Sequence, residues 1–151
     1  MYKRQLPWFR NSIQKHGLEA NFVVYGQVPR ERIFNLLPDF DIHIITSLLE
    51  ANTTVIWETM SWGIPTISLD HFGMADVIND SCGIKIPVKS YGQVVNCLAA
   101  TLDNLSLNPE KILQLKKGVY QSAVKYTWNN RIDFYESCYK KAIMNFTSKS
   151  K

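Results

Sequence analysis

Two glutamates in the middle of the sequence have the types and spacing that binding chemistry needs. Glu50 and Glu58 are separated by seven residues, the first in a predicted loop after a strand and the second in the helix that follows. Ligands of open α/β sheets bind at the carboxyl ends of the strands, where this loop lies. A carboxylate can accept two hydrogen bonds at once, which suits a pair of neighbouring hydroxyls. Taken alone, the pair is a weak signal and is more typical of two solvent-exposed side chains.

Three polar residues between the two glutamates stand at the start of the predicted helix. Asn52, Thr53 and Thr54 lie where backbone N–H groups have no partner within the helix, a position that suits a phosphate or diphosphate. The alternative is that Thr53 or Thr54 only caps the helix with its hydroxyl. The two roles are compatible.

The elements that position these residues alternate between strands and helices. Strands are predicted at residues 21–25, 41–45, 66–69 and 83–86. Pro29 opens one helix, and the helix after Thr54 is stopped by Gly63 and Pro65. This order predicts an α/β, Rossmann-like parallel sheet with flanking helices and right-handed crossovers.

The two ends of the chain are predicted to be helical. Residues 6–16 form a helix-like segment, and helical spacing of apolar residues returns at 91–102, 109–125 and 128–145. The last helix carries a wide apolar surface, so self-association is expected unless a partner covers it. A doubly wound nucleotide-binding half has five or six strands. Four predicted strands therefore indicate a half that is truncated at its N-terminus.

Composition limits the remaining possibilities. A chain of 151 residues with 46% apolar and 20% charged side chains is predicted to form a single domain, residues 1–151. The net charge of +4 comes mostly from the two termini, which disfavours nucleic-acid binding because that needs a basic patch on a folded face. Cys82, Cys97 and Cys138 are too widely spaced for a zinc site and are predicted to be buried free thiols. We find no membrane-spanning or signal segment, so a cytoplasmic location is expected, with contact at the inner membrane face left open.

The stretch that contains both glutamates resembles the C-terminal, donor-binding domain of family-four (group 1) retaining glycosyltransferases of the GT-B fold. That family's pattern is a glutamate, seven residues, a second glutamate, a small residue, an apolar residue and then Gly-x-Pro. Its elements here are Glu50, Glu58, Met60, Gly63 and Pro65. The resemblance covers residues 17–88 and continues weakly through the C-terminal helices at 91–145.

The resemblance implies a role for each part of the site. Glu58 would hold the ribose of a nucleotide, Glu50 would be the catalytic residue that holds hydroxyls of the donor sugar, and the diphosphate would bind at the helix start. The remaining donor-binding residues that it implies are Asn52, Thr53, Thr54, Gly26, Gln27, Val28, Gly73 and Met74. Residues 26–28 would lie near the base and 73–74 would line the sugar, although both segments are equally typical of ordinary turns. No metal or cofactor is expected.

The sequence departs from the family pattern in two places. Ala51, Asn52 and Thr53 stand where the family commonly has Gly-Phe-Gly, which limits how closely the backbone can approach a phosphate. The arginine and lysine that neutralise the leaving diphosphate in the family have no counterpart before Asn21. The resemblance also implies an acceptor-binding N-terminal domain, which we expect to be missing from this chain.

The predicted function follows from the resemblance. The chain would be the donor-binding half of an enzyme of polysaccharide biosynthesis that transfers a hexose from a nucleotide-diphosphate sugar to a carbohydrate or lipid-linked acceptor with retention. The isolated chain would be inactive and would need an N-terminal partner domain. The alternative is a non-catalytic fragment or subunit of a split transferase that binds a nucleotide or a partner. An epimerase of the same architecture is disfavoured because it needs catalytic groups from both domains.

Overall fold

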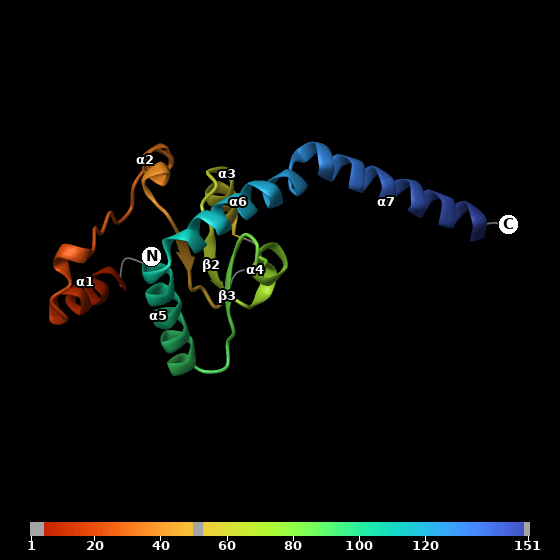
Figure 1. Cartoon of the computed structure of the whole chain (residues 1–151). Helices are drawn as coiled ribbons and strands as arrows, with labels where there is room; N and C mark the ends of the chain where they lie inside the picture. Colours follow the sequence, from red (N-terminus) through yellow and green to blue (C-terminus); the bar gives the residue numbers. More distant parts are fainter. Residues whose placement is uncertain (1–4, 50–52, 150–151) are drawn as a thin grey trace. The chain divides into compact units, whose positions relative to one another are not determined.

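The computed structural model describes residues 5–49 and 53–149 (Figure 1). Contacts divide the chain into two compact units, Met1–Pro38 and Asp39–Lys151. The first unit consists of helices and extended chain, whereas the second contains the sheet.

The first unit begins with α1 (Gln5–Lys15), which is followed by a 3-10 turn, η1 (Glu19–Asn21), and by α2 (Arg30–Leu36). Gly17 turns the chain after α1 in the left-handed conformation, with φ at 66°. The rings of Phe9 and Phe22 meet edge to face at 5.9 Å. This contact holds the extended segment after η1 against α1.

The strand predicted at residues 21–25 does not form, so the prediction is wrong there. Residues 22–25 are extended but belong to no sheet, and Val23 is 75% exposed. Their β-branched and aromatic side chains favour a strand, but a strand also needs a neighbour to complete its hydrogen-bond ladder. Among the described residues, no segment pairs with them.

The second unit follows a 3-10 turn, η2 (Leu37–Asp39), and is built on a parallel sheet. Its strands are β1 (His43–Ile45), β2 (Thr66–Leu69) and β3 (Gly83–Ile86), hydrogen-bonded in the order β1-β2-β3. Ile44 pairs with Ile67, which pairs with Ile84. The predicted strands 66–69 and 83–86 are confirmed with these bounds, and the strand predicted at 41–45 is confirmed from residue 43 onward.

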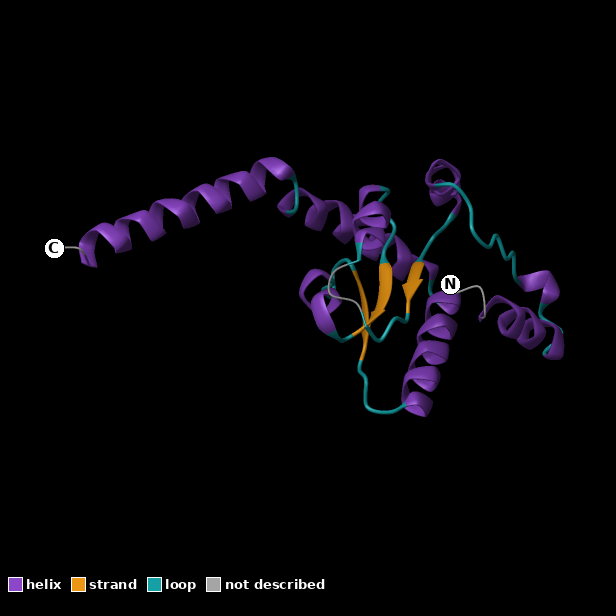
Figure 2. Ribbon diagram, turned by 180° about the vertical axis from the view of Figure 1, so that it is seen from behind, coloured by secondary structure: helices purple, strands orange, loops and turns teal. Residues whose placement is uncertain are grey.

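Helices cover both faces of this sheet (Figure 2). One buried cluster joins α3 (Thr54–Ser61), α4 (Phe72–Val77) and α6 (Pro109–Lys125) around Ile56, Met74 and Val119. The other joins β2 and β3 to α5 (Tyr91–Leu107) around Ile67, Leu69 and Leu105. The sheet is therefore the middle layer of an α/β sandwich.

Helix boundaries agree with the local signals where those signals are strong. Gly63 ends α3 with φ at 70°, and the N–H of Ile64 donates to the carbonyl of Thr59, which closes the last turn. Ser90 caps α5 by accepting a hydrogen bond from the N–H of Gln93. Helix α4 is a correction, because the sequence described residues 73–74 only as a sugar-lining segment or an ordinary turn.

The last helix, α7 (Trp128–Lys149), follows α6 after a short turn. Its start is tied to the unit by Asn130, whose Nδ2 donates to the carbonyl of Val124 at 2.6 Å. The prediction that all three cysteines are buried is wrong for this helix. Cys82 is buried and Cys97 is half-buried, but Cys138 of α7 is exposed.

Candidate functional site

The candidate site is the edge of the sheet where all three parallel strands end. At this edge β1, β2 and β3 end at Ile45, Leu69 and Ile86. The helices that follow β1 and β2 are α3 and α4, and they contain the predicted site residues Thr54, Glu58, Gly73 and Met74. Glu50 and Asn52 lie outside the described residues. The other candidates of this unit are placed below.

Thr53 and Thr54 form the start of α3, as predicted. Thr53 is the N-cap residue, with extended backbone angles of φ −85° and ψ 134°, but its side chain makes no capping hydrogen bond. The alternative role of Thr53, which is to cap the helix with its hydroxyl, is therefore not observed in this structure. The first turn of α3 keeps N–H groups that can bind an anion, and the helix dipole places partial positive charge there.

Glu58 lies in the same helix, one turn after Thr54 and on the same side of it. The residue is half-buried and interacts with another group of the protein. Its backbone carbonyl accepts a hydrogen bond of 2.7 Å from the hydroxyl of Ser61. Helix α3 thus has an N-terminus without a side-chain cap and the carboxylate of Glu58, four residues after Thr54.

Gly73 and Met74 belong to α4, which directly follows β2. Met74 is completely buried and packs in the core with Ile56 and Val77. Met74 therefore serves packing, and of the two residues only Gly73 has surface that a ligand can contact. Gly73 is half-buried at the start of the same helix.

Gly26, Gln27 and Val28 belong to the first unit. They form the turn between the extended segment and α2, and Gly26 has φ at 69° with open space around its α-carbon. The structure thus confirms the turn. Glu58 belongs to the second unit, so the structure does not group these residues with it.

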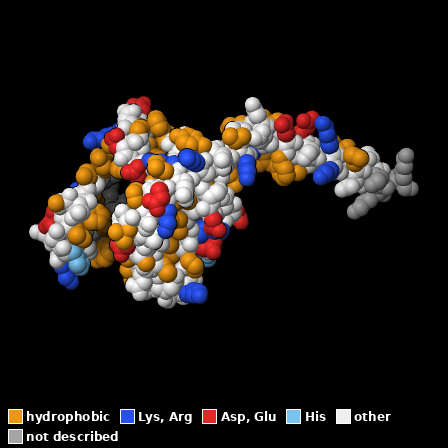
Figure 3. All heavy atoms as spheres, viewed as in Figure 1, with side chains coloured by type: hydrophobic (Ala, Val, Ile, Leu, Met, Phe, Trp, Pro, Cys, Tyr) orange, Lys and Arg blue, Asp and Glu red, His pale blue; other side chains and the backbone are white. Residues whose placement is uncertain are grey.

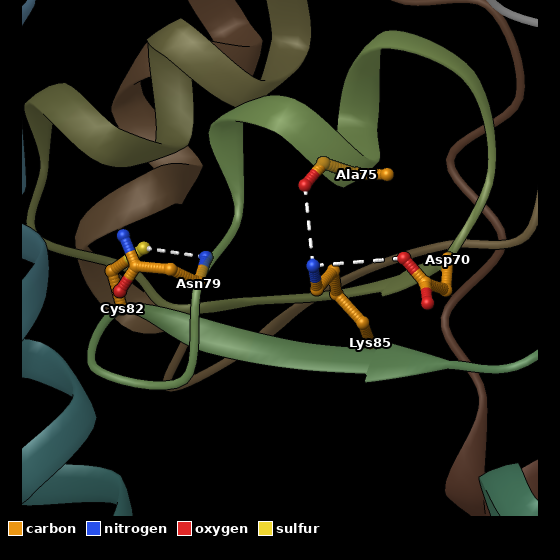
Figure 4. A network of polar contacts seen from close by, with 5 residues as sticks. All are labelled: Asp70, Ala75, Asn79, Cys82 and Lys85. Carbon is orange, nitrogen blue, oxygen red and sulfur yellow. Dashed lines mark hydrogen bonds and ion pairs between the residues drawn. The ribbon is translucent and has the colours of Figure 1, made fainter.

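Several features of the edge had no signal in the sequence. Lys85 of β3 lies 3.6 Å from the carboxylate of Asp70, the residue after β2, and its Nζ donates to the carbonyl of Ala75 at 3.2 Å (Figure 4). This lysine ties the end of β2 to α4. Figure 4 also shows the hydrogen bond from the N–H of Asn79 to Sγ of Cys82, which supports the turn before β3.

Phe72 begins α4 in an unusual conformation. Its φ of 51° is the only positive value among the described residues other than glycine, and its ring lies 4.0 Å from that of His71. A bulky residue with positive φ is strained, and such strain clusters at functional sites. His71, the residue before Phe72, is exposed.

A polar row runs from β1 across β2 to α3. Nδ1 of His43 lies 3.1 Å from Oγ1 of Thr66, which lies 3.5 Å from Oγ1 of Thr59. Burial lowers the pKa of His43 below its ordinary value of 6.5. Ser68 lies two residues after Thr66 in β2. Its hydroxyl is buried and has no hydrogen-bond partner among the described residues. An unsatisfied hydroxyl near the carboxyl end of a central strand is a polar group that a ligand can satisfy.

Cavities lie at this edge and away from it. A cavity of about 380 Å³ is lined at the edge by the loop after β1, the end of β2 and the first turn of α5, including Thr46, Leu69 and Tyr91. A larger and more open groove of about 860 Å³ lies between β3, α5 and α6. Glu58 lines neither. The edge is the better candidate for a ligand site than the larger groove, because α/β sheets bind ligands at the strand ends and not along the flanks of their helices.

Two negative findings apply to the part of the chain that the structure describes. No group of three or more His, Cys, Asp or Glu side chains is arranged to hold a metal ion there. Within the same residues, every helix is too short or too polar to cross a membrane.

The family model described as "Glycosyl transferases group 1" matches residues 3–121. The chain belongs to this family. The resemblance seen in the sequence is thereby confirmed, including the stretch that contains Glu50 and Glu58. No curated protein sequence matches the chain.

Solved structures of glycosyltransferases share the fold. Sucrose-phosphate synthase from Thermosynechococcus elongatus has a TM-score of 0.72 at 18% identity, covering 94% of this chain and 34% of that one. The C-terminal domain of a group 1 family glycosyl transferase from Francisella tularensis has a TM-score of 0.69 at 18% identity, covering 83% and 65%. The pneumococcal O-GlcNAc transferase GtfA, in complex with UDP and GlcNAc, has a TM-score of 0.74 at 19% identity, covering 92% and 28%.

These comparisons confirm the α/β fold as part of a GT-B architecture. The chain spans about a third of the synthase, and less than two thirds of each of these three structures. A GtfA/B complex is also similar, with a TM-score of 0.74 at 18% identity, covering 89% of this chain and 27% of that one.

Proposed function

We propose that this chain is the donor-binding half of a retaining glycosyltransferase that uses a nucleotide-diphosphate sugar. The observation that carries the proposal is the start of α3, where an uncapped helix N-terminus is followed by Glu58 four residues later at the carboxyl edge of the sheet. This is the place where the fold binds ligands. Membership of the group 1 family supports a glycosyl donor as that ligand.

Each group of the proposed site matches one part of the donor. The backbone N–H groups near Asn52, Thr53 and Thr54 bind the diphosphate, because their partial positive charge faces its negative charge. Glu58 accepts hydrogen bonds from the two ribose hydroxyls, which are strong because the acceptor is charged. Glu50 accepts hydrogen bonds from hydroxyls of the hexose.

The remaining contacts come from the turn at residues 26–28 and from the start of α4. The segment Gly26, Gln27 and Val28 lies near the base, and the segment of Gly73 and Met74 lines the sugar. Gly73 supplies the accessible surface of that segment, since it is half-buried whereas Met74 is completely buried. Ser68 is a further candidate, because its buried hydroxyl has no partner among the described residues.

The proposed chemistry is hexosyl transfer with retention and without a metal or other cofactor. The transition state is oxocarbenium-like, and the departing phosphate helps to deprotonate the acceptor hydroxyl. The start of α3 contributes by stabilising negative charge as it develops on the leaving group, and the two glutamates contribute by fixing the donor's orientation. The acceptor is a carbohydrate or a lipid-linked carbohydrate, and polysaccharide biosynthesis in the cytoplasm, free or at the inner membrane face, is the proposed setting.

Turnover requires an N-terminal acceptor-binding domain, supplied by a longer polypeptide or by a partner chain. The small share of each similar structure that this chain covers supports this requirement, and so does the similarity to a GtfA/B complex. A non-catalytic nucleotide-binding subunit is the second candidate. Transfer assays with and without a group 1 N-terminal half separate the two, because only the first candidate gains activity when that half is added.

Calorimetry with UDP, GDP and ADP and the corresponding monophosphates tests the proposal directly. We expect one diphosphate to bind in the high micromolar to millimolar range, and its monophosphate to bind more weakly, because the helix start recognises the diphosphate. A folded sample that binds none of the diphosphates at millimolar concentration would remove the proposed site.

A further inference from the structure

The connection from β2 to α4 turns sharply at the carboxyl edge of the sheet. The N–H of His71 donates to the carbonyl of Leu69 at 2.8 Å, which closes a γ-turn around Asp70. Phe72 then has φ at 51°, a strained value for a bulky residue that persists only when the surrounding structure holds it. Helix α4 begins at this residue. The position of its first turn therefore depends on what holds the connection on either side.

Two neighbouring residues of β3 hold the connection before the strained residue. The N–H of Asp70 donates to the carbonyl of Ile86 at 2.8 Å, which extends the pairing of β2 with β3 by one residue. The carboxylate of Asp70 lies 3.6 Å from Nζ of Lys85. Both side chains are partly exposed, so this ion pair contributes little to overall stability. It does fix the position of Asp70 relative to β3.

The same lysine holds the connection after the strained residue. Nζ of Lys85 donates to the carbonyl of Ala75 at 3.2 Å (Figure 4). Ala75 belongs to the last turn of α4, where carbonyls have no partner within the helix. The N–H of Asn79 would donate to the Ala75 carbonyl if the helix continued, but it donates to Sγ of Cys82 instead. A lysine suits this place because its charge faces the negative end of the helix dipole.

The start of α4 lies beside the proposed diphosphate site. β1 and β2 are neighbours in the sheet, and parallel strands lie about 4.8 Å apart. The diphosphate is placed at the start of α3, which follows β1, whereas α4 follows β2. A hexose linked to that diphosphate therefore reaches the end of β2 when it extends along the carboxyl edge. The accessible residues there are His71 and Phe72, which are exposed, and Gly73, which is half-buried.

Lys85 is arranged to hold protein groups rather than the donor. Of its three N–H donors, one binds the carbonyl of Ala75, and the carboxylate of Asp70 lies within ion-pair distance of the same nitrogen. Its side chain is only 28% exposed. On the face of the second unit seen in Figure 3, Lys and Arg side chains lie among acidic ones, as Lys85 lies beside Asp70. The lysine therefore acts on a ligand through α4.

We propose that Lys85 is a positioning residue for the sugar of the donor. By holding Asp70 and Ala75 on either side of Phe72, it fixes the surface of α4 that the hexose contacts. This inference rests on the proposed function, since it requires a nucleotide sugar at the carboxyl edge. The diphosphate and the ribose are bound by α3, whereas Lys85 acts on α4. Loss of the lysine should therefore weaken binding of the hexose and leave binding of the nucleotide unchanged.

Saturation-transfer difference NMR tests this split, because it reports the protein contacts of hexose and ribose protons separately. The probes are UDP-glucose, GDP-mannose and ADP-glucose, and the one that binds best is used. Lys85→Met keeps an unbranched side chain and removes the charge. It should lower the hexose signal relative to the ribose signal by about two-fold or more, because a binding surface must be held within a fraction of an ångström to keep its contacts. Calorimetry with the corresponding nucleoside diphosphate should give the same Kd as for the unmodified chain.

Two further variants show whether the effect comes from this contact. Lys111→Met removes an exposed lysine that also donates a hydrogen bond, to Oδ1 of Asn104 at 2.7 Å. Lys111 lies at the start of α6, beyond the end of α5 that is farther from the carboxyl edge (Figure 1), so this variant should keep the hexose signal. Asp70→Asn should lower the hexose signal in the same direction as Lys85→Met. The two changes together should lower it no further than Lys85→Met alone, since they act through one contact.

The outcomes separate this inference from the proposed function. A Lys85→Met sample that keeps the ratio of hexose to ribose signal, even if both signals fall together, would limit Lys85 to a structural role and overturn the inference. An unmodified chain that contacts the ribose but not the hexose would overturn it as well. In both cases the nucleotide still binds and the proposed donor site stands. An unmodified chain that binds none of the nucleotide sugars or diphosphates would overturn the proposed function, and this inference with it.

Discussion

Gly118 of α6 lies directly against the backbone carbonyl of Ser81, in the turn before β3. A side-chain carbon added at residue 118 would overlap that carbonyl, and neither backbone can move without shifting α6 or the sheet. The glycine therefore sets how closely α6 approaches the sheet. It also places Val119, the next residue, in the buried cluster with Ile56 and Met74.

The Gly118→Ala variant should accordingly be destabilised. We expect its free energy of unfolding, from urea denaturation, to fall by about 1 to 3 kcal/mol, the usual cost of overpacking. Gly92→Ala is the matched control, because it lies in α5 with no atom within 4 Å of the added carbon. That change should leave stability equal or raise it by about 0.5 to 1 kcal/mol, since alanine favours a helix. Equal stability of the two variants would contradict this account of the α6 contact.

His43 should make stability depend on pH. Burial lowers the pKa of its imidazole in the folded state, whereas the unfolded chain keeps the ordinary value of about 6.5. Below pH 6.5 the unfolded state therefore binds a proton that the folded state does not, and stability falls as pH falls toward the folded pKa. Above pH 6.5 both states are neutral and the contribution is constant.

The measurement compares the unmodified chain with His43→Gln in chemical denaturation between pH 5 and pH 8. The unmodified chain should lose stability more steeply between pH 6.5 and 5, by at most about 1.4 kcal/mol per pH unit. The two curves should run parallel above pH 7. Curves that stay parallel over the whole range would show that His43 does not titrate in this way.

Arg131 is predicted to anchor α7 through its stack on Trp57 and Tyr126. Arg131→Ala should lower the free energy of unfolding by about 0.5 to 1 kcal/mol, the usual strength of such a contact at a partly exposed site. Lys141→Ala, which removes a positive charge from the exposed part of the same helix, should change it by less than about 0.5 kcal/mol. If the two changes cost the same, then the loss comes from charge rather than from stacking.

Most of the sheet could be predicted because the apolar residues and stop signals of its strands agree with the burial of those strands in the fold. The residues of β2 are all buried, and Gly63 and Pro65 mark the stop before it. Residues 22–25 have the same kind of side chains but did not form a strand, since pairing depends on a neighbour that propensity cannot supply. Helix α4 was missed because it has only six residues, and His71, its N-cap residue, forms no side-chain cap.

The site was predictable only in part. Thr53, Thr54 and Glu58 could be placed on one helix because the helix start and the Gly63 stop are visible in the sequence. The contact of Lys85 with Asp70 depends on the register of β3 against β2, and the positive φ of Phe72 depends on the turn into α4. Neither has a local sequence signal. The unsatisfied hydroxyl of Ser68 likewise emerges only from three-dimensional packing.

Replacing Glu50 should affect the reaction rate, whereas replacing Glu58 should affect donor binding. Contacts with the ribose are the same before and during the reaction, whereas contacts with the sugar can strengthen as its bond to the phosphate breaks. In an enzyme reconstituted with an N-terminal half, Glu50→Ala should chiefly lower kcat, and Glu58→Ala should chiefly weaken donor binding. Equal losses of affinity from both changes would contradict this division of roles.

The affinity of Glu58→Ala for the best-binding nucleoside diphosphate tests the central proposal most directly. Calorimetry should show a loss of about 1.5 to 3 kcal/mol, roughly ten- to hundred-fold in Kd, because hydrogen bonds to a charged acceptor are removed. Glu110→Ala is the control, since Glu110 is exposed at the start of α6, outside the strand-end loops of the candidate site. It should bind as the unmodified chain does. Unchanged affinity in a folded Glu58→Ala sample would contradict a donor site beside α3.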